Sequence, residues 1–171
     1  RLSLVGSEMC IRDRFDEEHG VNVVQGWGMT ETSPLATANI KTKEMEAMPK
    51  EELYKLQTKQ GKPVFGVELK IVDDDGNKVP EDGEAYGKLL IRGPWVNKRY
   101  YKHEADAIDA DGWFDTGDIS SIDPDGYMTI VDRAKDVIKS GGEWISSVDL
   151  ENAAQSHPDV MQACVIVVAH Q

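Results

Sequence analysis

Short runs of alternating apolar and polar residues, separated by tight turn signals, fill the middle of the chain between Pro63 and Arg133. In Val67–Ile71 three aliphatic residues alternate with Glu and Lys, which is typical of a strand with one buried face. Asp and Gly residues, which tight turns favour, fill Asp73–Gly76 and Asp123–Gly126. Short strands joined by tight turns predict an antiparallel β region, folded as a small twisted sheet or barrel-like subdomain.

Helical patterns and a short strand precede this region. The segment RFDEEHG reads as the end of a helix that is closed by Gly20. Residues 21–34, VNVVQGWGMTETSP, predict a short strand that runs into a loop. A helix is expected over 49–61, with Pro49 in its first turn and Gly61 beyond its end.

A mixed pattern follows the β region. Ser146 stands three residues before Asp149, the spacing of a helix N-terminal cap, and this helix is expected to end near His157. The apolar run 160–169, VMQACVIVVA, then predicts a buried strand. The fold class is therefore α/β, with an antiparallel β region followed by the start of an α+β unit.

The charge balance excludes several kinds of partner. With 19 basic and 31 acidic residues the net charge is −12. We expect no nucleic-acid or anionic-membrane partner, because both need clustered cations. The longest apolar run, Ala163–Ala169, is far shorter than the roughly 20 residues of a membrane span. Cys10 and Cys164 have no metal or redox spacing, which favours a reduced, cytoplasmic chain.

Both ends of the chain look cut, since it lacks an initiator Met and stops directly after an apolar run. We therefore expect a fragment. Residues 1–14, RLSLVGSEMCIRDR, resemble a translated sequencing adapter and are expected to be non-native. The alternative is a real strand in which Leu2 and Leu4 alternate before a turn at Gly6.

The first of three stretches that carry chemistry is GWGMTETSP, Gly26–Pro34. Its small and hydroxylic residues allow a backbone to approach an anion. Trp27 is suited to stack on a flat base, Thr30 to bond a phosphate oxygen, and Glu31 to hold magnesium through a hard oxygen. The alternative is an ordinary glycine-rich turn.

The second stretch is DGWFDTGDIS, 111–120. Asp118 follows a glycine at the entry to a strand, where its carboxylate is suited to accept hydrogen bonds from the two hydroxyls of a ribose. The alternative is an aspartate turn, in which Asp115 or Asp118 bonds local amides.

The third stretch is VDRAKDVIKSGGEWIS, 131–146. Arg133 offers a planar fork of donors, and Lys135 and Lys139 are mobile cations. The alternative is a solvated run of charges at the end of a strand.

In this order the stretches resemble motifs of the adenylate-forming superfamily, which includes acyl-CoA synthetases, luciferases and peptide-synthetase adenylation domains. GWGMTE is similar to the aromatic-Gly-x-Thr-Glu motif, GKLLIRGPWVNKRYY to the strand motif that follows it, GWFDTGD to the ribose motif and DRAKDVIKSGGEWIS to the hinge motif. The resemblance covers Arg14–Gln171. The run SGGEWISSVDLEN is most similar to bacterial medium- and long-chain fatty-acyl-CoA synthetases and to relatives that activate methylthio-propionate.

The resemblance implies a two-step reaction that uses ATP, Mg²⁺ and coenzyme A. A carboxylic acid attacks the α-phosphorus of ATP to give an acyl-adenylate and pyrophosphate, and the thiol of coenzyme A then displaces AMP. It also implies that 15–132 is the C-terminal part of the AMP-binding N-terminal domain. Residues 133–171 would then be the hinge and the truncated start of the C-terminal domain.

Individual roles also follow from the resemblance alone. The adenine and α-phosphate would be lined by Gln25, Gly26, Trp27 and Thr30, and the acyl group would be touched by Met29. Thr30 and Glu31 would be catalytic, with Glu31 binding Mg²⁺, and the ribose would be held by Asp118 and Arg133. Lys135 would be the hinge, Lys139 would lie by the adenylate, and the coenzyme A path would be bordered by Gly141 and Gly142.

Two family elements are absent from the chain: a Ser/Thr/Gly-rich phosphate loop expected upstream and a catalytic lysine expected downstream. The chain alone is therefore expected to be inactive. Lys98–Tyr101, KRYY, lacks the glycine that many members carry before the tyrosines. Two alternatives stay open: another adenylate-forming enzyme, such as a peptide-synthetase domain, and, from a different class, a non-catalytic nucleotide-binding module. Whether the full-length enzyme is a homo-oligomer is also open.

Overall fold

The computed structural model describes residues 14–140 and 143–166. By its internal contacts the chain divides into two compact units. The first unit is Val24–Val131, and the second contains the described residues before Val24 and from Asp132 onward. The first two motif stretches therefore belong to the first unit, and nearly all of the third belongs to the second.

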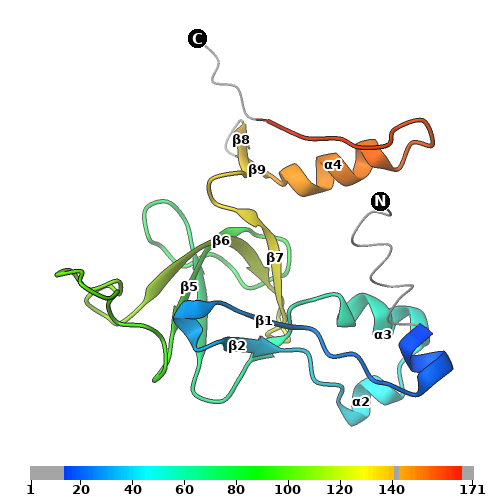
Figure 1. Ribbon diagram of the computed structural model, residues 1–171, viewed down its shortest axis with the longest axis horizontal. Coiled ribbons are helices and arrows are strands. Elements are labelled where there is room, and N and C mark those ends of the chain that lie inside the picture. The colour runs from blue at the N-terminus through cyan, green and yellow to red at the C-terminus, as the bar shows by residue number, and fades with distance from the viewer. Residues whose placement is uncertain (1–13, 141–142, 167–171) are drawn as a thin grey trace. The chain divides into compact units, whose positions relative to one another are not determined.

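A four-stranded sheet forms the centre of the first unit (Figure 1). Its strands are β4 (Glu68–Val72), β5 (Gly87–Arg92), β6 (Phe114–Ile122) and β7 (Met128–Arg133), in that order across the sheet. β5 runs antiparallel to both β4 and β6. Leu89 and Ile91 of β5 are fully buried, and Lys88 and Leu90, which alternate with them, are partly exposed. The antiparallel region predicted from the alternating pattern is therefore confirmed.

A smaller sheet contains the first motif stretch. β1 (Gly26–Gly28) pairs antiparallel with β2 (Leu35–Ala38), which pairs antiparallel with β3 (Lys62–Pro63). A short 3₁₀ helix, η1 (Thr30–Thr32), lies in the connection between β1 and β2. The strand predicted within 21–34 is limited to β1. Its partner strand β2 ends at Ala38, opposite Gly26, so residues 21–25 have no residues of β2 to pair with.

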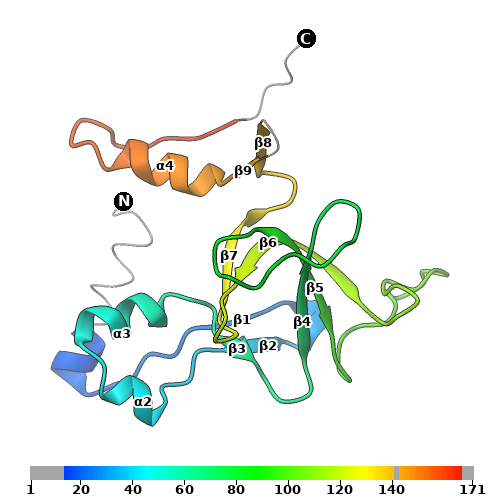
Figure 2. The ribbon, with the colours of Figure 1, turned by 180° about the vertical axis from the view of Figure 1, so that it is seen from behind.

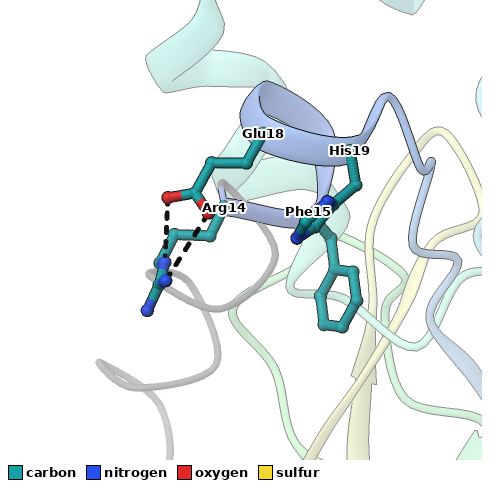
Figure 3. A pocket seen from close by; sticks show the side chains of 4 residues that line it. All are labelled: Arg14, Phe15, Glu18 and His19. Atoms are coloured by element: carbon teal, nitrogen blue, oxygen red, sulfur yellow. Dashed lines mark hydrogen bonds and ion pairs between the residues drawn. The ribbon is translucent and has the colours of Figure 1, made fainter.

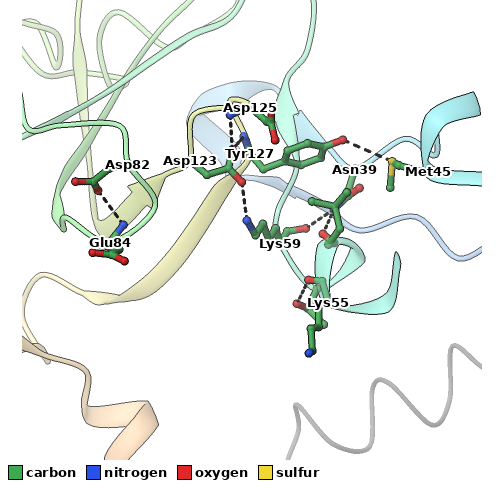
Figure 4. Close-up of polar contacts among 11 residues, drawn as sticks. Asn39, Met45, Lys55, Lys59, Asp82, Glu84, Asp123, Asp125 and Tyr127 are labelled. Carbon is green, nitrogen blue, oxygen red and sulfur yellow. Dashed lines mark hydrogen bonds and ion pairs between the residues drawn. The ribbon is translucent and has the colours of Figure 1, made fainter. Parts of the chain in front are cut away.

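Two helices, α2 (Lys43–Glu46) and α3 (Lys50–Gln57), follow β2 and lie beyond one end of β1 and β2 in both views (Figures 1 and 2). The helix predicted over 49–61 is real but shorter. Asn39, which is 2% exposed, donates from Nδ2 to the carbonyls of Leu56 and Lys59 at 2.7 and 3.0 Å (Figure 4). The Leu56 carbonyl is in the last turn of α3 and the Lys59 carbonyl lies two residues beyond Gln57, so Asn39 bonds acceptors that a longer helix would use itself.

Gly61 does not cap α3 as predicted. Its φ is +94°, and it pairs with Met128 of β7. A Cβ at this position would lie 2.2 Å from the carbonyl carbon of Ala38, so only glycine fits between β2 and the incoming strand.

One buried apolar cluster joins the two sheets. Trp27 and Val64 of the smaller sheet region are partly buried and pack against this cluster. Each fully buried aliphatic side chain contributes about 1.5–3 kcal/mol, so the cluster fixes the β1–β2 connection against the larger sheet. Its members are Ala36, Val67, Ile71, Leu89, Ile91, Ile122 and Met128.

In the second unit, residues 14–19 are helical, and the Gly20 N–H bonds the Asp16 carbonyl at 3.0 Å with a φ of +62°. The predicted closure of this helix at Gly20 is therefore confirmed. β8 (Ile138–Ser140) pairs antiparallel with β9 (Glu143–Ile145), and α4 (Ser147–Gln155) follows. The hydroxyl of Ser146 accepts the Asp149 N–H at 3.1 Å, which confirms the predicted cap.

The buried strand predicted over 160–169 is wrong as far as the structure describes that run. Residues 161–166 form no strand, and Met161 and Ile166 are 89% and 76% exposed. An apolar run becomes a buried strand only when a neighbouring strand and a covering layer are available, and none pairs with it in the described ranges. Within those ranges, no helix is long and apolar enough to cross a bilayer.

Candidate functional site

The loop between β1 and β2 closes on one buried hydroxyl. The side chain of Thr32 is fully buried, and its Oγ1 accepts the Met29 N–H at 2.8 Å. The same oxygen lies 2.9 Å from the Met29 carbonyl and 2.5 Å from the Pro34 carbonyl. A Cβ on Gly28 would lie 1.7 Å from the Pro34 carbonyl oxygen, so this closure requires glycine. Thr30, which follows Met29 in the loop, is exposed.

A second segment, Pro94–Tyr100, forms hydrogen bonds to this loop. The phenol of Tyr100 donates to Glu31 Oε1 at 2.7 Å, and the Asn97 N–H donates to the Glu31 carbonyl at 2.7 Å. Ser33 Oγ donates to the Trp95 carbonyl at 3.2 Å. The hydrogen bond to Glu31, together with burial and the negative charge, raises the pKa of the Tyr100 phenol. Sequence reasoning missed this contact because the partners are 69 residues apart.

The remaining residues of the first stretch have mixed surroundings. Trp27 packs partly against the apolar cluster, while Gly26 is exposed. The Gln25 carbonyl accepts the Asn39 N–H at 2.8 Å. The adenine and phosphate roles of these residues stay predictions.

Asp118 lies inside β6 and is 5% exposed. Its N–H donates to Thr116 Oγ1 at 3.1 Å, and that hydroxyl donates to the Leu89 carbonyl at 2.9 Å. The local aspartate turn is made by Asp115, whose Oδ1 accepts the Gly117 N–H at 2.9 Å. The aspartate turn weighed as the alternative is therefore present at Asp115. The ribose role of Asp118 stays a prediction.

In the second unit the predicted hinge segment is a hydrogen-bonded turn. The carbonyl of Arg133 accepts the N–H groups of Asp136 and Val137 at 3.0 and 2.9 Å, with Lys135 exposed between them. Lys139 lies on β8, with Nζ 4.0 Å from the centre of the Trp144 ring on β9. Gly141 and Gly142 lie outside the described residues.

Asp132 is a buried group that sequence reasoning did not single out. It is 7% exposed, and its Oδ2 accepts both the N–H and the hydroxyl of Ser147. In the sequence Asp132 is only one of several charges around Arg133, and acidic residues are mostly exposed, so nothing there indicated that it would be buried.

A hollow in the second unit is separate from the motif residues. Arg14, Phe15, Glu18 and His19 line it (Figure 3), and Arg14 Nε lies 3.1 Å from Glu18 Oε1. We assign no role to it.

The chemistry of Glu31 fits a magnesium ion. Mg²⁺ is usually bound by one or two carboxylates and by the phosphates of its substrate. Glu31 supplies one carboxylate whose Oε1 is held by Tyr100, and in the described part of the chain no group of three His, Cys, Asp or Glu side chains forms a self-sufficient metal cage. The chemistry of Glu31 is thus compatible with magnesium, and its role as a magnesium ligand stays a prediction.

Comparison with known proteins gives the family. The family model described as AMP-binding enzyme matches residues 6–101, more than half of the chain. The chain belongs to this family of AMP-binding enzymes, as its motifs predicted.

The curated relatives that the chain matches include CoA ligases. A 3-methylmercaptopropionyl-CoA ligase of Ruegeria lacuscaerulensis is 56% identical over 156 residues, covering 91% of this chain and 29% of the relative. A medium-chain-fatty-acid–CoA ligase of Ectopseudomonas oleovorans is 48% identical, covering 98% of this chain and 31% of the relative. The chain therefore spans about a third of the length of these relatives.

The fold matches a solved structure over nearly all of the chain. The o-succinylbenzoate CoA synthetase of Bacillus subtilis, in complex with its acyl-adenylate intermediate, superposes with a TM-score of 0.72 at 32% identity. The match covers 95% of this chain and 31% of that one. The predicted α/β fold with an antiparallel β region is thus confirmed as that of an acyl-CoA ligase segment.

Proposed function

We propose that this chain is the nucleotide-holding and hinge segment of an ATP-dependent acyl-CoA ligase. The observation that carries the proposal is the β1–β2 loop, which is closed on Thr32 and tied through Glu31 to Tyr100. The Glu31 carboxylate is thereby held next in sequence to Thr30, which is exposed. The buried acid Asp118 belongs to the same unit. The 56% identity to a CoA ligase supports a carboxylic acid and coenzyme A as the other substrates.

The residues of the proposed site suit the negative charge of the phosphates in the first half-reaction. A carboxylate oxygen attacks the α-phosphorus of ATP, the bond to the bridging oxygen breaks, and pyrophosphate leaves. When bound, Mg²⁺ neutralises phosphate charge that would otherwise repel the attacking carboxylate. Thr30 donates to a phosphate oxygen, Glu31 supplies a ligand oxygen, and Asp118 and Arg133 fix the ribose so that the phosphorus stays in line.

The second half-reaction needs a different arrangement around the same adenylate. The sulfur of coenzyme A attacks the acyl carbon, and AMP leaves with the bonding electrons. Lys135 is the proposed pivot that changes the arrangement between steps, and Gly141 and Gly142 would border the path of coenzyme A. We place this activity in the cytoplasm, where two widely spaced cysteines would stay reduced.

The acid is less closely defined than the reaction. Identity is 56% to the 3-methylmercaptopropionyl-CoA ligase and 48% to the medium-chain-fatty-acid–CoA ligase. This difference favours a short thioether acid, with a medium-chain fatty acid as the alternative.

The test is to replace the matching third of the Ruegeria lacuscaerulensis ligase with residues 15–171; the product is called the grafted ligase below. Carboxylate-dependent exchange of pyrophosphate into ATP measures adenylation, and loss of free coenzyme A thiol measures the second step. We expect both rates within about tenfold of the host enzyme, a barrier change of about 1.4 kcal/mol. A folded grafted ligase that binds AMP without exchange would favour a non-catalytic nucleotide module, and one that binds no AMP would contradict the proposal.

A further inference from the structure

Glu31 is held by two separate hydrogen bonds from one segment. Its main-chain carbonyl accepts the Asn97 N–H, and its side-chain Oε1 accepts the Tyr100 hydroxyl, both at 2.7 Å. In the described part of the chain Oε2 of Glu31 accepts no hydrogen bond. The carboxylate is therefore fixed by one oxygen and open at the other.

The segment that holds Glu31 is itself anchored on the same loop. Trp95 donates from Nε1 to the Leu35 carbonyl at 3.2 Å, and its own carbonyl accepts Ser33 Oγ at 3.2 Å. The Trp95 ring also lies 3.6 Å from the position that a Cβ on Gly66 would take. Trp95 thus ties the segment that carries Tyr100 to the loop at Ser33 and Leu35, two and four residues after Glu31.

A glutamate on a tight loop has three side-chain torsions to fix before it can hold an ion. A hydrogen bond to one oxygen removes that freedom in advance, in the way that groups around a metal ligand orient it. A phenol is suited to this task because it holds one oxygen as a neutral donor and leaves the negative charge on the carboxylate.

We propose that Tyr100 is a positioning residue for Glu31, which holds the carboxylate by Oε1 and leaves Oε2 available to the magnesium ion that a bound nucleotide would bring. The proposal rests on the proposed function, since it assumes that Glu31 is the magnesium ligand. It adds a residue from the KRYY segment, where the chain departs from the family pattern.

The experiment compares Tyr100→Phe with Tyr101→Phe in the grafted ligase. Tyr101 is the next residue, is 86% exposed and serves as the matched control. Calorimetric titration of ATP at a series of magnesium concentrations gives the concentration for half-maximal binding. Tyr100→Phe should raise it about fivefold, the effect of losing one hydrogen bond of ordinary net strength, and Tyr101→Phe should leave it unchanged.

Two further measurements separate positioning from general damage. Binding of AMP without magnesium should be the same in both variants, because the nucleotide site does not need the ion for AMP. In a Glu31→Gln background, Tyr100→Phe should have no further effect on the magnesium requirement.

Three results would overturn the proposal: an unchanged magnesium requirement in Tyr100→Phe, a lower one, or an equal loss with and without the Glu31 carboxylate. Failure of the proposed function is distinguishable from these, because the unsubstituted grafted ligase would then bind no AMP, or would bind AMP without pyrophosphate exchange.

Discussion

The buried carboxylate of Asp132 accepts hydrogen bonds from both the backbone N–H and the hydroxyl of Ser147, at 2.8 and 2.6 Å. Its other oxygen accepts the Arg133 N–H at 2.7 Å. Ser147 is the first residue of α4, so this pair joins the end of β7 to the start of the helix. Lys135 lies in the chain between the two residues. A rotation at Lys135 that carries α4 away from Asp132 must therefore break these bonds.

Removing the Ser147 hydroxyl should loosen the start of α4. A hydrogen bond to a charged group contributes about 1.5–3 kcal/mol, and Ser147→Ala loses one while it keeps the backbone bond. We expect faster amide hydrogen exchange in the first turn of α4, measured by mass spectrometry on the grafted ligase. Ser156→Ala is the control, because its hydroxyl bonds the Ala153 carbonyl at the other end of the helix. Unchanged exchange in Ser147→Ala would show that the pair does not hold the helix.

Lys135→Pro should separate the two half-reactions. Proline fixes φ at about −65° and restricts Ala134 before it, so the backbone at residue 135 could no longer change conformation between the two steps. Pyrophosphate exchange should remain largely intact and serves as the internal control. Thioester formation should fall strongly. Equal damage to both half-reactions, or to neither, would count against a hinge at Lys135.

Gly28→Ala should open the β1–β2 loop. The added Cβ would lie 1.7 Å from the Pro34 carbonyl oxygen and 2.9 Å from the Leu35 Cα, and backbone atoms cannot rotate away. We expect a strong loss of AMP affinity in calorimetric titration. Gly26→Ala is the graded comparison, because the added atom would meet its nearest neighbours at 3.3 and 3.4 Å and should cost less. Equal affinities in the two variants would mean that closure on Thr32 does not shape the site.

Asp123 should make the first unit sensitive to acid. Burial favours the neutral form, but the bonds from Lys59 Nζ and the Tyr127 N–H outweigh it and lower the pKa of Asp123 (Figure 4). A lowered folded pKa means stability that is present above the unfolded value, about 3.9, and lost as pH falls through the folded value.

The measurement is the melting temperature of the grafted ligase against pH. Asp123→Asn should flatten the acid slope and cost about 1 kcal/mol at neutral pH, as for a partly exposed pair. Asp125→Asn, in the same turn and exposed, should keep the slope. An acid slope that Asp123→Asn leaves intact would place the titrating group elsewhere.

Local patterns predicted the elements whose causes are local. The alternation in Val67–Ile71 marks β4 because successive side chains in a strand face opposite sides. The cap at Ser146 and the closure at Gly20 depend on a few neighbouring residues. The four motifs indicated the family because each carries several residue types at fixed spacing.

Contacts between distant residues were beyond such patterns. The early end of α3 involves Asn39, which comes from another segment and bonds one carbonyl in the last turn of the helix and one just beyond it. The Tyr100–Glu31 and Asp132–Ser147 pairs join residues 69 and 15 positions apart. The apolar run at 160–166 failed as a strand for the same reason, since burial needs partners that periodicity does not supply.

The central claim is that this chain holds a nucleotide by its ribose, and Asp118 tests it most directly. Calorimetric titration of the grafted ligase and its Asp118→Ala variant with AMP and 2′,3′-dideoxy-AMP gives four affinities. We predict that Asp118→Ala weakens AMP binding by about 1.5–3 kcal/mol, the value of hydrogen bonds to a charged group. Removing the ribose hydroxyls should then cost the variant almost nothing more. Equal AMP affinity with and without the Asp118 carboxylate, or losses from the two changes that simply add, would contradict the account.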